Sequence, residues 1–256
     1  MNLEILPTRT GGAAENMATD FLLLQRYPHA NAPRFRHYGW HGPAFTFGYS
    51  QKFSFIQTQM PAGERFDTCR RPTGGGLVDH RDDWTYALVI PRGHPLEELR
   101  ATQSYREVHE ALAAALRAQG ISAVTKQREV ERVAPNALSP EPAPWGQGAP
   151  PSNEAGPAGV CFQRAEIFDV VHERSGEKIA GAAQKRNKNG LLFQGSIWRP
   201  AVGGPIDWEK FYDDFVAELA KVLALPATRT PWPDIAEDEL SALVGHYSTP
   251  EWNEFR

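Results

Sequence analysis

Three short stretches of this chain carry residue types that could do chemistry together. The first, CRRPTGGGLVDH, runs from Cys69 to His80. Its three consecutive glycines let backbone amides approach a phosphate, a carbonyl or an extended chain closely. Arg70 and Arg71 precede them and can supply charge to an anionic group. The stretch matches neither G-x-x-x-x-G-K-[ST] nor a dinucleotide fingerprint. The alternative is a flexible turn with solvated arginines.

The second stretch, GEKIAGAAQKRNKNGLLFQGSI, covers residues 176–197 and has the pattern of a β-hairpin. Asn189-Gly190 is the expected turn, because a type I′ turn needs positive φ at both central residues. Lys178 stands before a run of small residues, 180–183, that leaves room for a ligand beside the strand. A lysine in a partly desolvated cleft can polarise a carbonyl or hold a carboxylate or phosphate. The alternative is an edge-strand lysine with its ammonium group in water.

The third candidate is Cys161, which follows a long loop and directly precedes a predicted strand. Catalytic groups often lie at such places, and a thiol becomes nucleophilic when a nearby cation stabilises its thiolate. A free cysteine can also be a small core residue, as we expect for Cys69. Only two cysteines occur, and the eight histidines show no metal-ligand spacing. We therefore predict neither a disulfide framework nor a metal site.

The elements that must position these residues mix helices and strands without regular alternation. Apolar spacing predicts four helices, at residues 14–26, 96–119, 207–223 and 234–247. Asp207 is the expected N-cap of the third helix, and Gly120 the terminator of the second. Short strands are predicted within 33–51, 65–91 and 166–197. Because no βαβ alternation runs through the chain, the sequence predicts an α+β fold.

The bulk properties describe one globular chain and exclude several partners. It has 256 residues, of which 41% are hydrophobic, and a net charge of −4. That charge gives no bulk electrostatic reason to bind nucleic acid. No apolar run is long enough to span a bilayer, and the first residues do not form a signal peptide, so we expect a cytoplasmic protein. Residues 134–158 hold seven prolines and three glycines and predict an exposed loop.

The motifs together resemble a known family. RRPTGGGLVDH, followed later by GEKIAGAAQKR and LLFQGSI, resembles the biotin/lipoate A/B protein ligases, more narrowly the lipoate-protein ligase and octanoyltransferase branch. AENMATD, HYGWHGPAFTFGYSQ and HYSTPEWN extend the resemblance over nearly the whole chain except the proline-rich loop. It implies mixed and antiparallel sheets packed with helices, as in the class II synthetase and biotin-ligase catalytic domain. We expect a monomer with a single catalytic domain over residues 1–256 and no accessory C-terminal domain.

The resemblance also implies a reaction, which places a lipoyl or octanoyl group on one lysine of a lipoyl carrier domain. Such domains include the glycine cleavage H protein and the E2 subunits of 2-oxoacid dehydrogenases. Lys178 matches the family lysine that contacts the acyl carbonyl and any adenylate phosphate, while Gly181 and Gly195 would let the acyl chain pass close to the backbone. The residues expected to bind the acyl group or acyl-adenylate are Arg71, Thr73, Gly74, Gly75, Gly76, Leu77, Val78, Asp79 and His80. The G-R-G-R-x-x pattern of biotin ligases is absent.

The acyl donor stays open at this level. In the favoured interpretation Cys161 takes octanoate from acyl carrier protein as a thioester, with no cofactor, because VCFQRAEIFDVV and WTYAL resemble segments of the octanoyltransferases. In the alternative, an ATP-dependent lipoate-protein ligase acts through lipoyl-AMP and needs ATP and Mg²⁺. Arg81 stands where many relatives carry an aspartate. A non-catalytic lipoyl-domain binder is a third possibility, although it would not need Arg71, Lys178 and Cys161 together.

Overall fold

The computed structural model describes residues 1–25, 32–127 and 164–255. Cys161 and the predicted loop 134–158 lie outside the described residues. In the described part, the large sheet has nine strands in the order β12-β1-β3-β7-β11-β10-β9-β8, with β2 paired to β3. Their bounds are β1 Leu3–Ile5, β2 Arg9–Gly11, β3 Arg34–Trp40, β7 Asp83–Pro91, β8 Ala123–Thr125, β9 Val170–His172, β10 Lys178–Asn187, β11 Gly190–Trp198 and β12 Ala227–Arg229.

A smaller sheet and the helices complete the described fold. The small sheet has three strands in the order β5-β4-β6, namely Asp67–Arg70, Ala44–Phe47 and Leu77–Asp79. The helices are α1 Ala13–Gln25, α2 Phe53–Gln59, α3 Pro95–Glu98, α4 Ala101–Ala118, α5 Trp208–Leu223, α6 Glu237–Tyr247 and α7 Pro250–Asn253, with a 3-10 turn at Arg199–Val202. Parallel and antiparallel pairs occur in both sheets, which confirms the predicted α+β class.

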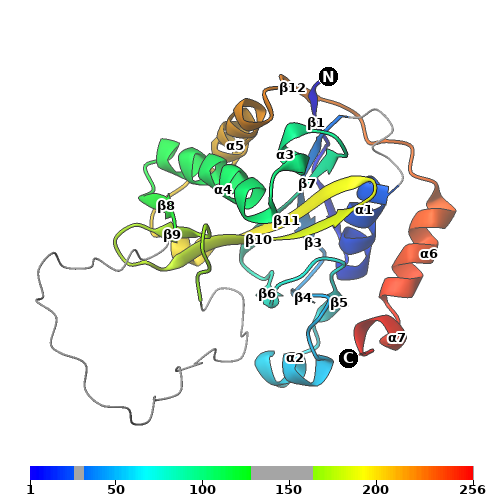
Figure 1. Ribbon diagram of the computed structural model, residues 1–256. Helices are drawn as coiled ribbons and strands as arrows, with labels where there is room; N and C mark the ends of the chain where they lie inside the picture. Colours follow the sequence, from blue (N-terminus) through cyan, green and yellow to red (C-terminus); the bar gives the residue numbers. More distant parts are fainter. Residues whose placement is uncertain (26–31, 128–163, 256) are drawn as a thin grey trace, which may run out of the picture.

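Helices cover both faces of the large sheet (Figure 1). The central strand β7 is buried along its whole length, and its side chains alternate between the two faces. Trp84, Tyr86 and Leu88 join the core beneath α4 and α5. Ala87 and Val89 join the core beneath α1 and α6. The small sheet, with α2, packs at one end of this layered body.

The α5 helix was predicted closely, while two other helices differ from the sequence pattern. Asp207 is the N-cap of α5, since its carboxylate accepts hydrogen bonds from the backbone amides of Glu209 and Lys210, each at 3.1 Å. The segment predicted as one helix over 96–119 is two helices, because Leu99 and Arg100 have extended backbones with ψ of 153° and 148°. The last predicted helix begins at Glu237 rather than at residue 234.

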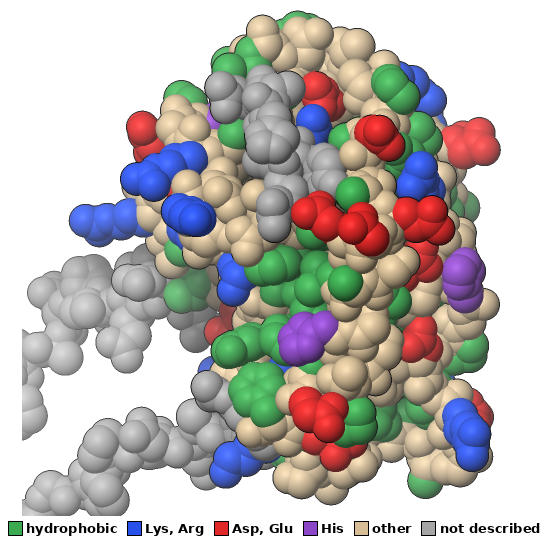
Figure 2. All heavy atoms as spheres, turned by 90° about the vertical axis from the view of Figure 1, so that its right-hand side faces the viewer, with side chains coloured by type: hydrophobic (Ala, Val, Ile, Leu, Met, Phe, Trp, Pro, Cys, Tyr) green, Lys and Arg blue, Asp and Glu red, His purple; other side chains and the backbone are tan. Residues whose placement is uncertain are grey.

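Figure 2 shows the face of the molecule around α6 and α7, where acidic and apolar side chains lie together. The first turn of α6 contributes Glu237, Asp238 and Glu239, whose charges suit the positive end of the helix dipole. None of the helices in the described ranges is long and apolar enough to cross a membrane.

The turn of the β10–β11 hairpin differs from the type I′ turn predicted at Asn189-Gly190. Asn187 pairs with Gly190, so the central turn residues are Lys188 and Asn189. Neither of these two residues has a positive φ, whereas Gly190 has a φ of 141°. The neighbouring strand explains the shift: a Cβ on Gly190 would lie 2.1 Å from the carbonyl oxygen of Ile90. Close packing against β7, rather than the turn type, requires this glycine.

Gly190→Ala tests this interpretation. We expect it to lower the free energy of unfolding by about 2–4 kcal/mol, because the new Cβ forces both a strained φ and a backbone clash. Urea unfolding measures the change. Gly42→Ala is the matched control, since a Cβ there meets nothing within 4 Å, and it should stay within about 0.5 kcal/mol of the parent. Equal unfolding midpoints for the two variants would show that Gly190 is not required by packing.

Candidate active site

The predicted motif residues meet around a cavity of about 40 Å³ where the small sheet and the glycine loop lie against the large sheet. Those that line it are Arg71, Gly75, Val78, His80, Lys178, Gly181 and Gly195. A larger cavity of about 620 Å³ lies on the opposite face of the sheet, beside α5, and none of the predicted residues lines it. The small cavity is the candidate active site because charged and hydrogen-bonding side chains converge there.

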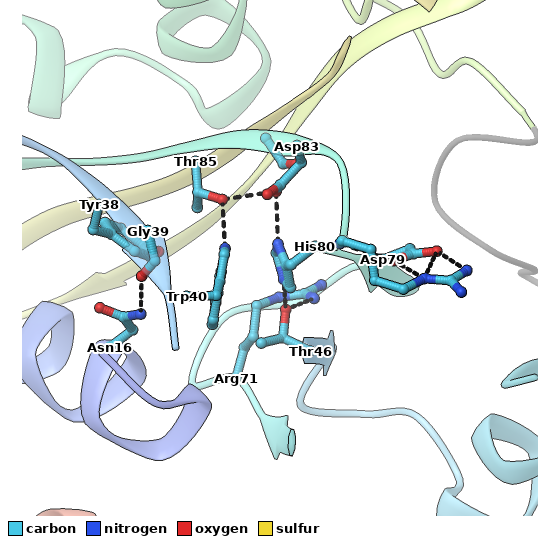
Figure 3. A network of polar contacts seen from close by, with 12 residues as sticks. Asn16, Tyr38, Gly39, Trp40, Thr46, Arg71, Asp79, His80, Asp83 and Thr85 are labelled. Carbon is cyan, nitrogen blue, oxygen red and sulfur yellow. Dashed lines mark hydrogen bonds and ion pairs between the residues drawn. The ribbon is translucent and has the colours of Figure 1, made fainter. Parts of the chain in front are cut away.

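His80 follows β6 and is buried between two polar partners (Figure 3). Its Nδ1 lies 2.6 Å from Oδ2 of Asp83, and its Nε2 lies 2.7 Å from Oγ1 of Thr46. Trp40 stacks on the imidazole with 4.0 Å between ring centroids. Thr46 and Val78 are paired across the antiparallel β4–β6 ladder, and alternate residues share a face, so His80 lies beside Thr46.

Asp83 connects this histidine to the large sheet. Its Oδ2 also accepts hydrogen bonds from the hydroxyl groups of Thr85 and Ser196. Burial alone would raise the pKa of the Asp83 carboxyl, but the electrostatic interaction with His80 and the hydrogen bonds from His80, Ser196 and Thr85 together hold it below its ordinary value. The acidic partner of His80 is therefore Asp83, and the aspartate missing at Arg81 is not needed for that contact.

Arg71 holds the glycine loop in a closed shape. Its Nη2 donates to the carbonyl oxygens of Gly74 and Gly76 at 2.8 and 2.9 Å, and its Nη1 donates to Oγ1 of Thr46 at 3.0 Å. Gly75 has a φ of 91°, which favours glycine. The loop is folded around a buried guanidinium group, so the alternative of a flexible turn with solvated arginines is wrong.

Arg70 has a different function from the one suggested by its place beside Arg71. Its guanidinium donates to the backbone carbonyls of Tyr49 and Gln51, and to those of Trp252 and Asn253 in α7, at 2.7–3.1 Å. These bonds anchor the C-terminal helix beside the glycine loop. These contacts of Arg70 are structural, which corrects the expectation that it supplies charge to an anionic ligand.

Lys178 is buried, and the edge-strand alternative is wrong for it. Its Nζ lies 2.7 Å from Oδ2 of Asp169, and only 5% of its side chain is exposed. The register of the β9–β10 ladder shifts between Lys178 and Ala180, and such a bulge can turn a side chain to the other face. A Cβ on Gly181 would lie 2.8 Å from Cε and Nζ of Lys178. Gly181 therefore makes room for the ammonium group itself.

A second layer of side chains orients Asp169. Its Oδ1 accepts a hydrogen bond from the hydroxyl of Tyr105, whose oxygen in turn accepts one from the backbone amide of Ala182 at 3.0 Å. The ring of Tyr105 packs on His109 at 4.1 Å between centroids. Nδ1 of His109 lies 2.7 Å from the carbonyl oxygen of Phe168. The ammonium of Lys178 is thus held in place by α4 as well as by its own sheet.

Several predicted residues do not reach the cavity. Leu77 packs in the core of the small sheet, and the Asp79 carboxylate is bound by Arg81 at 2.6–3.0 Å. Oγ1 of Thr73 donates a hydrogen bond to Oε1 of Gln194 at 2.7 Å, so Thr73 positions a residue that lines the cavity without lining it itself. Gly195 does line the cavity, but with its backbone, because a Cβ there would point to the core and lie 2.2 Å from the Tyr86 ring. Its missing side chain makes room for Tyr86, and the close approach of an acyl chain to its backbone stays a prediction.

Sequence reasoning missed the polar partners that complete the site. These are Thr46, Asp83, Asp169, Gln194 and Ser196. All but Asp83 lie within stretches quoted for the family resemblance, but none of the five was assigned a role there. The alternation of β11 offers the one available signal, because Gln194 and Ser196 share a face and interrupt an otherwise apolar strand.

The fold and the site define an α+β catalytic domain in which a fixed ammonium group and a buried imidazole face one narrow cavity. The profile of the lipoyl protein ligase A/B catalytic domain matches residues 12–199. The chain therefore belongs to that family, as its motifs predicted.

Relatives and solved structures agree with this assignment. Octanoyltransferase LipM of Geobacillus kaustophilus is 31% identical over 186 residues, covering 72% of this chain and 60% of that protein. Octanoyltransferase LipM of Symbiobacterium thermophilum is 26% identical and covers 98% of both chains. The chain thus spans about 60% of the first of these relatives. Protein Ta0514 of T. acidophilum with bound lipoic acid has a TM-score of 0.69 at 18% identity and covers all of both chains, so it has the same fold.

The burial of His109 predicts a specific pH dependence of stability. Burial lowers the pKa of His109 to about 4. The unfolded chain, with an ordinary histidine, takes up a proton first as the pH falls, so stability decreases on acidification. Between about pH 7.5 and about pH 5 this one group should cost about 2 kcal/mol. Urea unfolding of the wild type and of His109→Gln at both pH values measures it.

The difference between the two proteins isolates His109, because His37 and His94, whose pKa values are also lowered by burial, titrate in both. Glutamine can still donate to the Phe168 carbonyl but does not titrate in this range. The same loss of stability in both proteins would contradict the assignment.

Proposed function

We propose that this chain transfers an octanoyl group from acyl carrier protein to a lysine of a lipoyl carrier domain through a thioester on Cys161. The observation that carries the proposal is the buried ammonium of Lys178, which lines the cavity and is held there by Asp169 at 2.7 Å. A fixed cation at that place suits a reaction in which a carbonyl oxygen becomes negatively charged. The relatives named octanoyltransferase support the choice of reaction.

Each residue has a defined task in the proposed reaction. The Cys161 thiolate attacks the thioester carbonyl of the donor, and the carrier sulfur leaves as a thiolate that takes up a proton from solvent. Lys178 and the backbone amides near Gly75 stabilise the oxyanion. The acceptor lysine amine then attacks the acyl-enzyme, the amide forms, and the Cys161 thiolate leaves. In the sequence only a short segment separates Cys161 from Asp169, which holds Lys178.

The acceptor in this proposal is a lipoyl domain. A structure of the bi-partite lipoate protein ligase of Thermoplasma acidophilum and its E2 lipoyl domain has the same fold, with a TM-score of 0.67 and 17% identity over 99% of this chain. A lysine on a protruding turn of such a domain would reach a narrow cavity more easily than one on a flat surface.

The ATP-dependent ligase is the second candidate, and lipoate-protein ligase A bound with ATP shares this fold with a TM-score of 0.65 at 17% identity. The described side chains fit a nucleotide with Mg²⁺ less well. The carboxylates nearest the cavity are engaged, Asp83 with His80, Asp169 with Lys178 and Asp79 with Arg81. Within the described ranges no cluster of three metal-ligating side chains occurs. We therefore derive no step through ATP.

The covalent step is tested by the intact mass of the protein after incubation with octanoyl carrier protein. We expect one octanoyl adduct on the wild type and none on Cys161→Ala. Cys69→Ala is the matched control and should keep the adduct, because Cys69 is buried and burial raises the pKa of its thiol far above the ordinary value. An adduct on Cys161→Ala would contradict the thioester. Lipoate-dependent pyrophosphate release from ATP, with no transfer from octanoyl carrier protein, would establish the ligase instead.

Gly181→Ala tests the position of Lys178. The new Cβ would lie 2.8 Å from Cε and Nζ, so it displaces the ammonium group from Asp169. We expect the rate of octanoyl transfer to fall by about 10²-fold or more, as when one donor to an oxyanion is lost. The fold should persist, because the atoms that must move end a flexible side chain, and circular dichroism checks this. Gly245→Ala, where a Cβ meets nothing within 4 Å, is the control. Unchanged transfer by Gly181→Ala would remove Lys178 from the mechanism.

A further inference from the structure

A hydroxyl, an imidazole and a carboxylate lie in hydrogen-bonded series beside the cavity, and Figure 3 shows the three side chains in line. Oγ1 of Thr46 lies 2.7 Å from Nε2 of His80, and Nδ1 of His80 lies 2.6 Å from Oδ2 of Asp83. All three side chains are buried, and Thr46 and His80 line the cavity. This is the order in which a hydroxyl, a general base and an orienting carboxylate cooperate in acyl-transfer enzymes.

The hydrogen-bond partners limit where the protons of this series can lie. The Asp83 carboxylate can only accept, so Nδ1 of His80 carries the proton between them, and when the ring acts as a base its Nε2 is the acceptor. Arg71 can only donate, and its Nη1 donates to Oγ1 of Thr46 at 3.0 Å. In that state the single proton of Thr46 points to His80. A hydroxyl oxygen has two lone pairs, so Thr46 can still accept a hydrogen bond from a ligand in the cavity.

We propose that Thr46, His80 and Asp83 form a proton relay that removes a proton from the acceptor amine during transfer. The inference rests on the proposed function, because it requires an amine nucleophile. It assigns His80 a role as general base, through Thr46, in place of the pocket-lining role expected from the motif.

The other titratable side chains that line the cavity are unsuited to this task. Lys178 is ion-paired with Asp169 at 2.7 Å, and a cation cannot take up a proton. Arg71 is likewise a permanent cation. The hydroxyl of Tyr38 donates to Asp20, and burial raises the pKa of this tyrosine well above its ordinary value. His80 is thus the one imidazole among the described side chains that line the cavity, and we assign it the role of the base.

The step balances without an additional reactant. The acceptor lysine attacks as a neutral amine, having lost one proton to solvent. As the N–C bond forms, one N–H proton passes to Oγ1 of Thr46 while the proton of Thr46 moves to Nε2 of His80. Asp83 stabilises the resulting imidazolium, and Arg71 stabilises negative charge that develops on Oγ1. When the C–S bond breaks, Cys161 leaves as a thiolate and His80 releases its proton to solvent, so both groups return to their starting forms.

A pair of substitutions at Thr46 separates this relay from a purely structural network. Thr46→Val keeps the shape but removes the hydroxyl, whereas Thr46→Ser keeps the hydroxyl. Enzyme loaded by octanoyl carrier protein is mixed with apo lipoyl domain, and the loading and transfer rates are measured separately. We expect Thr46→Val to slow transfer about 100-fold or more while loading changes little, and Thr46→Ser to stay within about tenfold of the wild type.

Hydroxylamine as the acceptor supplies a readout that a structural role would not change. This amine loses its proton far more readily than a lysine, so its attack needs the relay less. The ratio of the wild-type transfer rate to that of Thr46→Val should therefore be at least tenfold smaller with hydroxylamine than with lysine. Asp83→Asn is the second variant and should show the same selective loss, so the test survives if Thr46→Val fails to fold. Three results would each overturn the relay but not the proposed function. Thr46→Val could slow transfer equally with lysine and hydroxylamine, Thr46→Val and Thr46→Ser could slow transfer equally, or Thr46→Val could transfer at the wild-type rate. A wild type that transfers to no acceptor from either donor would overturn the proposed function itself.

Discussion

The ion pair between Lys178 and Asp169 is the constraint on which the site depends. An ammonium group can stay inside a sheet only when an opposite charge lies against it, because an unpaired buried charge costs several kcal/mol. In the structure Asp169 supplies that charge, the register of the β9–β10 ladder shifts beside the lysine, and Gly181 leaves space for its ammonium group. Tyr105 reaches from α4 to orient the carboxylate. One buried charge thus depends on a partner carboxylate, a small neighbour and a residue from a packed helix.

Buried polar groups need partners, and this need also explains the hydrogen bonds where the two sheets join. The small sheet contributes Thr46 and His80, and the large sheet contributes Asp83. A second hydrogen bond between Thr73 and Gln194 crosses the same junction. Gln194 in turn donates to Asp20, which is ion-paired with Arg36 at 2.6 Å. Directional bonds hold the sheets together at defined points, whereas close apolar packing would fill the space between them.

The sequence predicted the parts of this structure that depend on local pattern. The spacing of Phe211, Phe215 and Leu219 and the N-cap Asp207 were enough for α5, since a helix buries residues three and four apart. The motif residues Arg71, His80 and Lys178 were identified because glycine runs and isolated lysines are unusual in strands. The family, which the profile match confirms, followed from two such motifs in order.

What the sequence could not predict depends on contacts between distant segments. Asp169 becomes the partner of Lys178 only after β9 and β10 pair, and Thr46 meets His80 only through the β4–β6 ladder. The turn at Asn189-Gly190 was misplaced for a related reason, because the Ile90 carbonyl on another strand fixes the position of Gly190.

Two side chains that line the cavity divide the electrostatic tasks of the proposed reaction. Lys178 brings a fixed positive charge from β10, where Asp169 and Tyr105 keep it from moving. His80 brings a base whose proton can move, because one ring nitrogen is tied to a carboxylate and the other to a hydroxyl. A single residue could not do both, since a group that stabilises an oxyanion must stay charged while a base must start neutral. Lys178 lies in β10 and His80 follows β6, so each task has its own element and its own carboxylate partner.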